Sequence, residues 1–379
     1  MENFTLFNPV TLHFGRDVIQ KLPAIAAGYG NRVLFVYGKG SIKSNGIYDQ
    51  VISQLNAAGI KITEYGGIKP NPVVEDVDAA AVLGRNNHVD MIIAVGGGSV
   101  IDSAKAISLA IPVSHSAWDF YSGKVNPQRA IPLIAVLTLA ATGTEMNMFS
   151  VVQNHADGRK LGYGHPLMYP VHSFLDPSYT FSVSAKHTAY GIADLIAHCL
   201  ENYFGLGAAS LTDRFIFSII SEAVEYSPKV LAEPYNYEYR AAIMFAATMA
   251  LNGLTVNGKG VGDWGVHSTG HVLSLLYDIP HGATLSIVYP AWLKLHMPLL
   301  ESKILQFGNA IFGTNTAIEA VESLERFFTG IGCPVTLPEA GITAESKNEI
   351  LAAMKHNRVQ GINYKFSALQ WEKLLDLMF

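Results

Sequence analysis

The sequence has few charged side chains and almost no cysteine, and each shortage excludes a class of protein. Charged residues make up 15% of the 379 residues and hydrophobic residues 49%, whereas about 25% charged is typical of globular domains. The two cysteines, Cys199 and Cys333, are too few for a disulfide framework. We therefore expect a cytoplasmic protein with a large core and with further surface buried between subunits.

The sequence also lacks a basic block and a long apolar run. The net charge is −5, and the sequence contains no cluster of Lys and Arg. Both features argue against binding to nucleic acid or to an anionic membrane. The longest apolar stretch, residues 130–141, contains Pro132 and Thr138 and is shorter than the roughly 20 residues that span a bilayer. Residues 1–30 show no signal-peptide pattern. We expect neither a nucleic-acid partner nor a membrane span.

The first half of the chain alternates between strand and helix patterns. Short β-branched runs predict buried strands, and the segments between them have helical spacing. The predicted strands are 32–37, 61–65, 90–95 and 131–138, and the predicted helices are 47–58, 74–86 and 100–111. This alternation is typical of a Rossmann-like α/β domain, with helices on both faces of a parallel sheet.

From Ser182 onward only helical spacing is left. Apolar residues recur at helical intervals through 187–204, 211–231, 238–256, 265–276 and 283–297. The pattern predicts an α/β dinucleotide-binding domain of residues 1–178 and an all-α domain of residues 179–379.

A glycine turn follows the predicted strand that ends at Val95. Gly96, Gly97, Gly98 and Ser99 lead from this strand into a helix, where free backbone N–H groups favour an anion such as a diphosphate. A tight turn without a ligand is the alternative, and three consecutive glycines favour the phosphate. A second turn, residues 38–41, closes the first strand at a position where a cofactor ribose often meets the protein.

Two short windows of the helical half contain potential metal ligands. Asp194 and His198 are four residues apart, so they leave the same face of one helix. His267 and His271 repeat this spacing, and His281 follows a proline that ends the preceding helix. One carboxylate and three imidazoles complete a metal site. The spacing does not decide which four of the five residues bind.

The combined motifs resemble the iron-containing (group III) alcohol dehydrogenase family. The resemblance spans nearly the whole chain and rests on residues 96–99, Asp102, Lys105, Thr138, residues 142–145, Gly191 and the Asp/His set. Trp118-Asp119 and residues 137–147 resemble the branch of butanol dehydrogenases and broad aldehyde reductases. The resemblance implies a nucleotide-binding α/β domain with a helical domain, in a dehydroquinate synthase-like architecture, and a homodimer.

The resemblance also assigns roles to individual residues. It implies that one divalent metal, Fe²⁺ or Zn²⁺, is bound by Asp194, His198, His267 and His281, and that the catalytic residue His271 lies near the nicotinamide without binding metal. The expected cofactor-binding residues are Gly38, Lys39, Gly40, Ser41, Asn71, Gly97, Gly98, Ser99, Asp102, Thr138, Thr142 and Lys160.

The expected reaction is hydride transfer between NAD(P)H and primary alcohols such as butanol or the matching aldehydes. Other branches of the family carry Asp at the position of Gly38, so we expect NADP(H) to be preferred and NAD(H) to be possible. The ligand types suit both iron and zinc, and the physiological substrate stays open.

Three alternatives share these motifs in part. A dehydroquinate synthase-like lyase binds a polyanionic substrate, whereas residues 187–285 contain only Arg214, Lys229, Arg240 and Lys259 as Lys or Arg. A glycerol-type polyol dehydrogenase is the second alternative, and the family resemblance implies a metal site of three ligands for it. A non-catalytic metal- or nucleotide-binding protein is the third alternative, and an assay of cofactor oxidation with a short aldehyde separates it.

Overall fold

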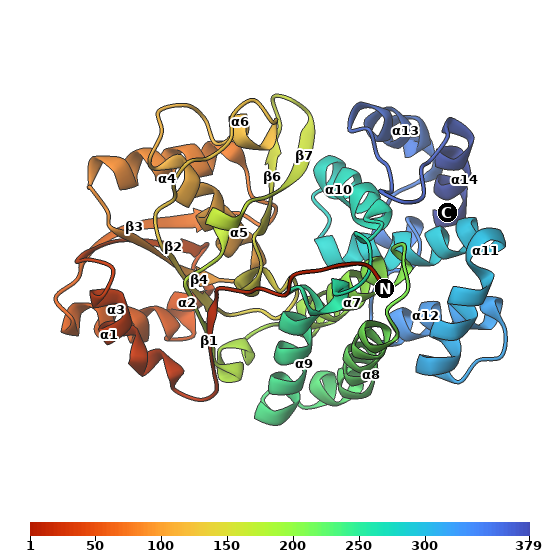
Figure 1. The fold of residues 1–379 in the computed structure, drawn as a ribbon, viewed down its shortest axis with the longest axis horizontal. Coiled ribbons are helices and arrows are strands. Elements are labelled where there is room, and N and C mark those ends of the chain that lie inside the picture. Colours follow the sequence, from red (N-terminus) through yellow and green to blue (C-terminus); the bar gives the residue numbers. More distant parts are fainter. The chain divides into compact units, whose positions relative to one another are not determined.

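The computed structural model describes all 379 residues, which form two compact units (Figure 1). One unit comprises residues 8–183, and the other comprises residues 184–379 together with residues 1–7. The predicted boundary after residue 178 lies inside a 3-10 turn, Pro177–Thr180. Residues 1–7 belong to the helical unit, where the backbone N–H of Glu2 donates to the carbonyl oxygen of Gly258 at 2.9 Å.

Residues 8–183 form a six-stranded sheet in the order β1-β8-β5-β4-β2-β3, and every pair of neighbouring strands is parallel. The strands are β1 (Thr11–Phe14), β2 (Arg32–Gly38), β3 (Lys61–Ile68), β4 (Met91–Gly96), β5 (Leu133–Leu137) and β8 (His172–Leu175). Every residue of β4 and β5 is buried, as expected for strands with both faces covered. The predicted α/β class is confirmed.

Helices cover both faces of this sheet (Figure 1). The helices of the sheet unit are α1 (Leu22–Ala27), α2 (Ser41–Ser44), α3 (Ile47–Ala57), α4 (Val74–Asn86), α5 (Gly98–Ala110) and α6 (Trp118–Tyr121). Phe35 and Ile93 share one core with Val51 and Leu55 of α3. Because side chains alternate along a strand, the neighbouring residues face the opposite layer, where α4 and α5 contact the sheet.

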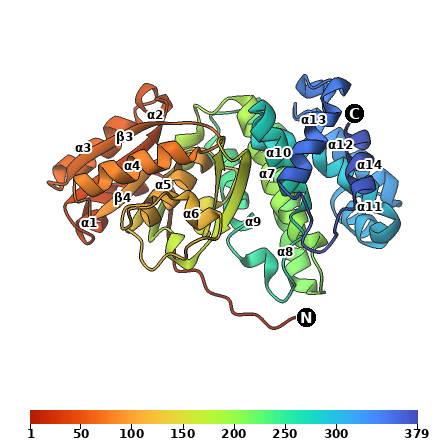
Figure 2. The same cartoon turned by 90° about the horizontal axis from the view of Figure 1, so that it is seen from above.

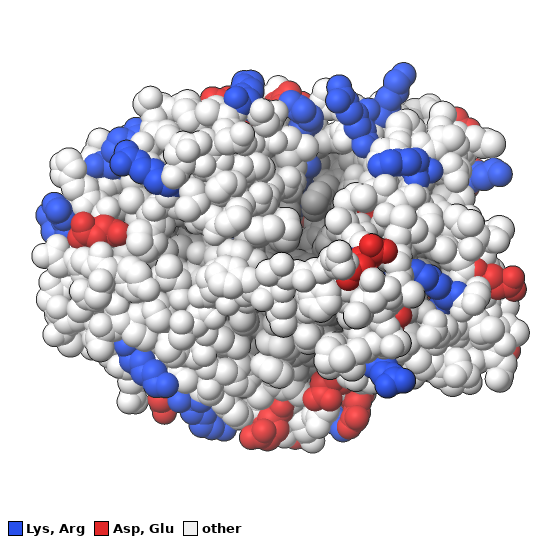
Figure 3. Space-filling view, in the orientation of Figure 1, with Lys and Arg blue, Asp and Glu red and all other residues white.

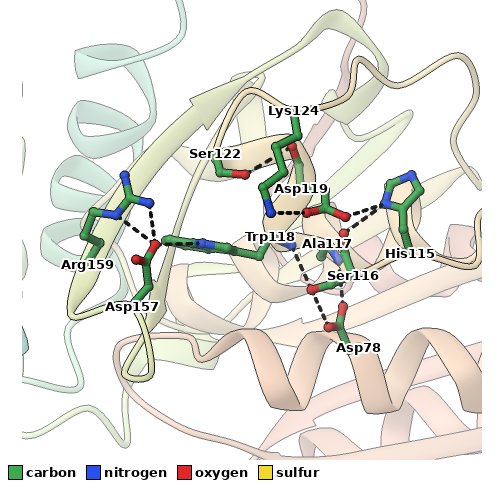
Figure 4. Close-up of polar contacts among 10 residues, drawn as sticks. All are labelled: Asp78, His115, Ser116, Ala117, Trp118, Asp119, Ser122, Lys124, Asp157 and Arg159. Carbon is green, nitrogen blue, oxygen red and sulfur yellow. Dashed lines mark hydrogen bonds and ion pairs between the residues drawn. The ribbon is translucent and has the colours of Figure 1, made fainter.

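An antiparallel hairpin, β6 (Phe149–Asn154) and β7 (Arg159–Gly164), adds to this unit, and the sequence pattern did not predict it. Figure 4 shows how its tip is bound to α6. Asp157 Oδ2 accepts hydrogen bonds from Trp118 Nε1 at 3.0 Å and from Arg159 Nε at 2.8 Å. On the other side of α6, Asp78 accepts from the backbone N–H of Ala117 at 2.8 Å. These contacts fix the hairpin that carries Lys160.

The second unit is helical. Its helices are α7 (Ala185–Phe204), α8 (Ser210–Ala232), α9 (Tyr237–Ala250), α10 (Gly265–Tyr277), α11 (His281–Phe312), α12 (Ala317–Gly330), α13 (Lys347–His356) and α14 (Ala368–Met378). Helix α7 contacts α8, α9, α10 and α11 (Figure 2), and every residue of it from Thr188 to Phe204 is buried. The predicted all-α half is confirmed.

Two predicted helix ends are wrong. Helix α9 ends at Ala250 rather than at residue 256, because Gly253 has a φ of 99° and a 3-10 turn, Leu254–Val256, follows. Helix α11 continues through Pro290 and Pro298 to Phe312. The other 3-10 turns are Val18–Lys21, Thr144–Met146, Pro166–Met168, Pro338–Ala340 and Ala344–Ser346.

The surface reflects the low share of charge. On the face drawn in Figure 3, Lys and Arg side chains are dispersed, with wide uncharged areas between them. None of the helices combines the length and the hydropathy that a membrane span needs.

Candidate metal centre and cofactor site

Three helices of the second unit bring Asp194 together with three histidines. Asp194 and His198 lie on α7, His267 lies on α10, and His281 is the first residue of α11. Three imidazole nitrogens surround the Asp194 Oδ1 atom: His198 Nδ1 at 3.6 Å, His267 Nε2 at 3.8 Å and His281 Nε2 at 4.0 Å. The structure therefore groups the four residues that the family resemblance named as ligands.

The donor atoms lie close enough together to be candidate ligands of one divalent cation. One ligand atom each from Asp194, His267 and His281 can be chosen so that all three lie within 4.8 Å of one another, whereas ligands around a tetrahedral ion such as Zn²⁺ lie about 3.4 Å apart. His198 is outside that trio despite its contact with Asp194. Asp194 Oδ1, His198 Nδ1 and His267 Nε2 are buried without hydrogen-bond partners. Such orphaned polar atoms are costly, and a bound cation would satisfy them.

Two glycines allow the three helices to approach one another. A Cβ atom on Gly282 would lie 1.9 Å from the carbonyl oxygen of Tyr190 on α7. A Cβ atom on Gly270 of α10 would lie 2.7 Å from Thr284 Oγ1 on α11. Both distances are too short for a side chain, so glycine at these positions lets α11 begin next to Asp194.

The imidazoles have opposite electrostatic surroundings. Burial lowers the pKa of His198 to about 4, against the effect of Asp194. Burial also disfavours the charged form of His267, but the two nearby carboxylates, Asp194 and the hydrogen-bonded Glu201, outweigh it and raise the pKa of His267 to about 9. His271 is half-buried, and its ring centroid lies 5.2 Å from that of His281.

The glycine turn after β4 is open to an anion. Gly97 is the N-cap residue of α5, and no side chain caps this helix, so the first N–H groups of α5 are available to a ligand. A Cβ atom on Gly98 would lie 2.6 Å from Thr142 Cγ2, and one on Gly97 would lie 3.1 Å from Leu139 Cβ. Glycine thus brings the predicted residues Gly97, Gly98 and Ser99 close to the turn that contains Thr142.

A buried lysine anchors that turn. Lys105 Nζ donates to Thr144 Oγ1 at 2.8 Å, to Asn147 O at 2.8 Å and to Phe149 O at 2.8 Å. Asp102 belongs to the same network, since its Oδ1 accepts from Thr144 Oγ1 at 2.7 Å and its Oδ2 accepts from the Val151 backbone N–H at 2.9 Å. The role that the structure shows for Asp102 is to hold this turn. Its predicted contact with the cofactor stays a prediction.

The remaining predicted cofactor residues lie in three places. Lys160 on β7 donates to Asn71 Oδ1 at 2.7 Å, and both residues are buried. Thr138 follows β5, and its N–H donates to Gly96 O at 3.0 Å. Residues 38–41 connect β2 to α2, where Gly40 is an N-cap without a side-chain bond, and Lys39 and Ser41 are exposed.

Comparison with known proteins identifies the family. The model described as iron-containing alcohol dehydrogenase matches residues 9–177, and the model of the C-terminal region of the Fe-containing alcohol dehydrogenase family matches residues 188–378. The chain belongs to the iron-containing alcohol dehydrogenase family.

Individual members of the family are similar over their whole length. A probable NADH-dependent butanol dehydrogenase 1 of Bacillus subtilis is 38% identical over 387 residues, which cover 100% of this chain and 99% of the relative. The NADPH-dependent aldehyde reductase YqhD of Escherichia coli is 35% identical, with 94% of each chain covered. The crystal structure of NADH-dependent butanol dehydrogenase A from Thermotoga maritima superposes with a TM-score of 0.96 at 36% identity, covering 100% of this chain and 99% of that chain.

These relatives confirm the predicted branch of butanol dehydrogenases and aldehyde reductases, and with it the prediction of an oxidoreductase that acts on alcohols and aldehydes. For a member of the iron-containing alcohol dehydrogenase family, a divalent metal and a nicotinamide cofactor are the expected ligands. The individual binding residues stay predictions.

Sequence reasoning missed Glu201, which contacts His267 through hydrogen bonds. It lies three residues after His198 and seven after Asp194 on α7, so the helical period places all three on one face. Sequence reasoning included Lys105 only as part of a motif and assigned no role to it.

Proposed function

We propose that the chain reduces aldehydes to primary alcohols, and catalyses the reverse reaction, with NADPH as a cofactor that it uses at least as well as NADH. Butanol and butyraldehyde represent the proposed substrate pair. The observation that carries the proposal is the buried Asp194 carboxylate, which faces three imidazole nitrogens within 4.0 Å. A set of one carboxylate and three imidazoles suits Fe²⁺ or Zn²⁺.

Asp194, His198, His267 and His281 would hold the metal, which when bound supplies a Lewis acid that polarises the carbonyl oxygen of an aldehyde. Helix packing around α7 limits the access of water to Asp194, His198 and His267, which are 2%, 5% and 6% exposed, whereas His281 is only partly buried. In such a dry setting, fixed charges act more strongly on a developing negative charge than they do in water.

The sheet unit would bind the dinucleotide. Gly97, Gly98 and Ser99 would cradle the diphosphate at the N-terminus of α5, and Thr138 and Thr142 would line the cofactor next to this turn. Lys160, held by Asn71, would contact the nicotinamide ribose. NADPH and NADH both supply hydride, and the turn after β2 would distinguish them at the ribose 2′ position.

His271 is proposed to carry the proton. It lies one helical turn after His267 on α10 and has its ring next to that of His281. An imidazole at this position is suited to deliver a proton to the alkoxide oxygen, either directly or through water.

The lyase alternative lacks the cations that it needs. Of the four Lys and Arg in residues 187–285, two are buried and bound to protein groups. Lys259 Nζ donates to Tyr203 O at 3.0 Å, and Arg240 Nε donates to Pro234 O at 2.8 Å. They hold the helical unit together and are not placed to bind a polyanionic substrate.

We further propose a cytoplasmic homodimer. Phe4, Leu6 and Phe7 are 51%, 63% and 71% exposed, and apolar side chains exposed together in one segment are typical of an interface. Cys199 and Cys333 are both free thiols. Sedimentation equilibrium gives the mass in solution, and a monomer at micromolar concentration would contradict the dimer.

The experiment for the main proposal combines metal analysis with an aldehyde panel. Protein purified without oxygen and without added metal is expected to contain about one Fe²⁺ or Zn²⁺ per chain. It is expected to oxidise NADPH and NADH in the presence of butyraldehyde. Glyceraldehyde and glycerol are the comparison substrates for the polyol alternative. Cofactor oxidation that no aldehyde in the panel supports would refute the proposed activity.

A further inference from the structure

Glu201 is a buried carboxylate that lies outside the proposed ligand set but next to one of its members. It is 1% exposed. Its Oε1 atom accepts from the backbone N–H of His267 at 3.0 Å and lies 3.1 Å from His267 Nδ1, and its Oε2 atom accepts from the backbone N–H of Trp264 at 2.6 Å. A carboxylate is buried at acceptable cost only when donors satisfy it, and here all the donors come from the start of α10.

The position of Glu201 determines which nitrogen of His267 is free to bind a cation. The imidazole of His267 lies between two carboxylates of α7. Its Nδ1 atom is 3.1 Å from Glu201 Oε1, and its Nε2 atom is 3.8 Å from Asp194 Oδ1. An ionised carboxylate only accepts hydrogen bonds, so Nδ1 carries the hydrogen. In the neutral ring, the lone pair is therefore on Nε2 and faces Asp194.

The same carboxylate also holds the backbone of the helix that carries His267. Trp264, the N-cap residue of α10, has a φ of 62° and makes no side-chain capping bond. Glu201 accepts the N–H groups of Trp264 and His267 in its place, which is the interaction that a cap normally provides. A negative charge is also favourable at a helix N-terminus. Glu201 thus fixes both the ring of His267 and the start of its helix.

We propose that Glu201 is a positioning residue that raises the affinity of this site for a divalent cation by presenting His267 Nε2 in the binding tautomer. The inference rests on the proposed function, because it takes Asp194 and His267 as metal ligands. Carboxylates that orient ligating histidines typically contribute 10–100-fold to metal affinity. A purely structural carboxylate would cap α10 and leave that affinity unchanged.

The test measures Zn²⁺ affinity directly. Metal-free protein is titrated with Zn²⁺ in competition with a chromophoric chelator, and Co²⁺ is used in parallel because its visible spectrum reports on the ligand set. Glu201→Ala is expected to bind Zn²⁺ about 10–100-fold more weakly than the wild type. Glu201→Gln is expected to lose less, since its amide oxygen still accepts from Nδ1. This milder variant serves if the alanine variant does not fold.

Thr316→Ala is the matched control for the capping role. Thr316 caps α12 of the same unit, where its side chain accepts from the backbone N–H of Glu319 at 3.2 Å. Its loss is expected to lower the melting temperature of the metal-free protein and to leave the Zn²⁺ affinity and the Co²⁺ spectrum as they are. Glu201→Ala is expected to change all three.

A double-mutant cycle separates the possible outcomes. In a His267→Ala background, Glu201→Ala is expected to cause no further loss of Zn²⁺ affinity, because Glu201 acts through the missing ring. Wild-type Zn²⁺ affinity in both Glu201 variants would overturn the inference and leave the proposed metal site intact. A wild-type chain that bound neither Zn²⁺ nor Co²⁺ would overturn the proposed site itself, and the inference with it.

Discussion

Gly38 ends strand β2, where we propose that the turn distinguishes NADPH from NADH. A carboxylate there accepts hydrogen bonds from the ribose 2′-hydroxyl and repels a 2′-phosphate. The chain instead presents Gly38, the exposed Lys39 and Ser41, and Gly40 at an uncapped helix start, a set that suits a phosphate. The Bacillus subtilis relative is named as NADH-dependent and the Escherichia coli relative as NADPH-dependent, so this residue has to be tested in the chain itself.

We predict that Gly38→Asp raises the KM for NADPH by about tenfold or more, equivalent to ~1.4 kcal/mol, with little change for NADH. The backbone tolerates the substitution, because a Cβ atom at Gly38 would meet Val100 Cγ2 at 3.7 Å, an ordinary contact. Initial rates with both cofactors at saturating butyraldehyde give the two KM values.

Gly330→Asp is the control for this substitution. It adds the same charge to the last residue of α12, where a Cβ atom would have nothing within 4 Å. It is expected to leave both KM values unchanged. Equal losses for NADPH and NADH in Gly38→Asp would show that the substitution only damaged the turn.

His271 provides the second prediction at the residue scale. We expect His271→Ala to keep one metal per chain and to lower kcat by about 10²-fold, the usual contribution of a proton-transfer group. The measurement is metal content by mass spectrometry together with kcat for butyraldehyde reduction. His187→Ala, a histidine exposed in the first turn of α7, is the control and should match the wild type. Loss of metal from His271→Ala would place His271 among the ligands.

At the scale of elements, Asp263 joins the start of α10 to the segment that follows α13. It is fully buried. Its Oδ1 atom accepts from the backbone N–H groups of Asn363 and Tyr364 at 2.8 Å each, and its Oδ2 atom accepts from that of Gly265 at 3.3 Å. Burial raises the pKa of Asp263 to about 6, and these backbone hydrogen bonds oppose the rise only in part.

This pKa gives a stability prediction with a definite sign. The folded state binds the proton more tightly than the unfolded state, whose Asp pKa is about 3.9. The charged form therefore destabilises the fold above pH 6, and the penalty is relieved as the pH falls from about 6 towards 4. We predict that the free energy of unfolding of the wild type rises relative to that of Asp263→Asn over this range, by at most about 3 kcal/mol.

Urea unfolding of the metal-free proteins at pH 4, 5, 6 and 7.5 measures this difference. Tryptophan fluorescence follows the transition, since Trp264, Trp292 and Trp371 belong to the helical unit. Metal-free protein is used so that release of metal at low pH does not contribute. A difference that stayed constant between pH 4 and 6 would contradict the raised pKa.

Elements with a strong period could be predicted from the sequence, and elements without one could not. Strand β4 and helix α7 were found because β4 is a continuous apolar run and α7 has apolar residues at helical spacing. Strand β1 lies at the sheet edge and contains no buried residue, so it has no apolar run to detect. The hairpin β6–β7 depends on contacts such as Trp118 with Asp157, which are distant in sequence.

The features of the metal site could also be predicted from the sequence only in part. Asp194 and His198, like His267 and His271, were found because four residues make about one helical turn. The grouping of α7 with α10 and α11 depends on Gly270 and Gly282, where a Cβ atom would collide with the neighbouring helix. The sequence does not show which helices are neighbours, so the role of these glycines could not be predicted from it. Helix α12, with its capping box at Thr316 and Glu319, was detectable by a signal that the sequence reasoning did not use.

At the scale of the whole molecule, the two units differ in the groups that are available to bind a ligand. Residues 8–183 present uncapped backbone N–H groups at Gly97 and Gly40, which suit phosphates. The helical unit presents a buried carboxylate with imidazoles, which suits a cation. Each unit buries its own core, and the side chains proposed to bind metal come from helices that are already packed.

Because the proposed ligands come from helices that are already packed, we predict that the metal is needed for the reaction and is not required for folding. Helix α7 is buried from Thr188 to Phe204 and packs against α8, α9, α10 and α11, so we expect its apolar contacts to hold it without the ion. Chelation is expected to abolish turnover while the far-UV circular dichroism spectrum stays nearly unchanged. At free metal about 1,000-fold above Kd, binding adds about 4 kcal/mol of stability. Its removal should therefore lower the melting temperature by roughly 8–16 °C, at ~2–4 °C per kcal/mol.

His267→Ala separates metal binding from folding in the same measurement. The variant is expected to have no turnover, a far-UV spectrum like that of the wild type, and a cooperative melt close to that of the chelated wild type. Added Zn²⁺ should raise the melting temperature of the chelated wild type much more than that of the variant, which binds Zn²⁺ more weakly because it has lost a ligand. Retention of most of the kcat in His267→Ala would refute the ligand assignment. Collapse of the helical signal on chelation would show that the metal is structural, because α7, α10 and α11 would then depend on the ion for their packing.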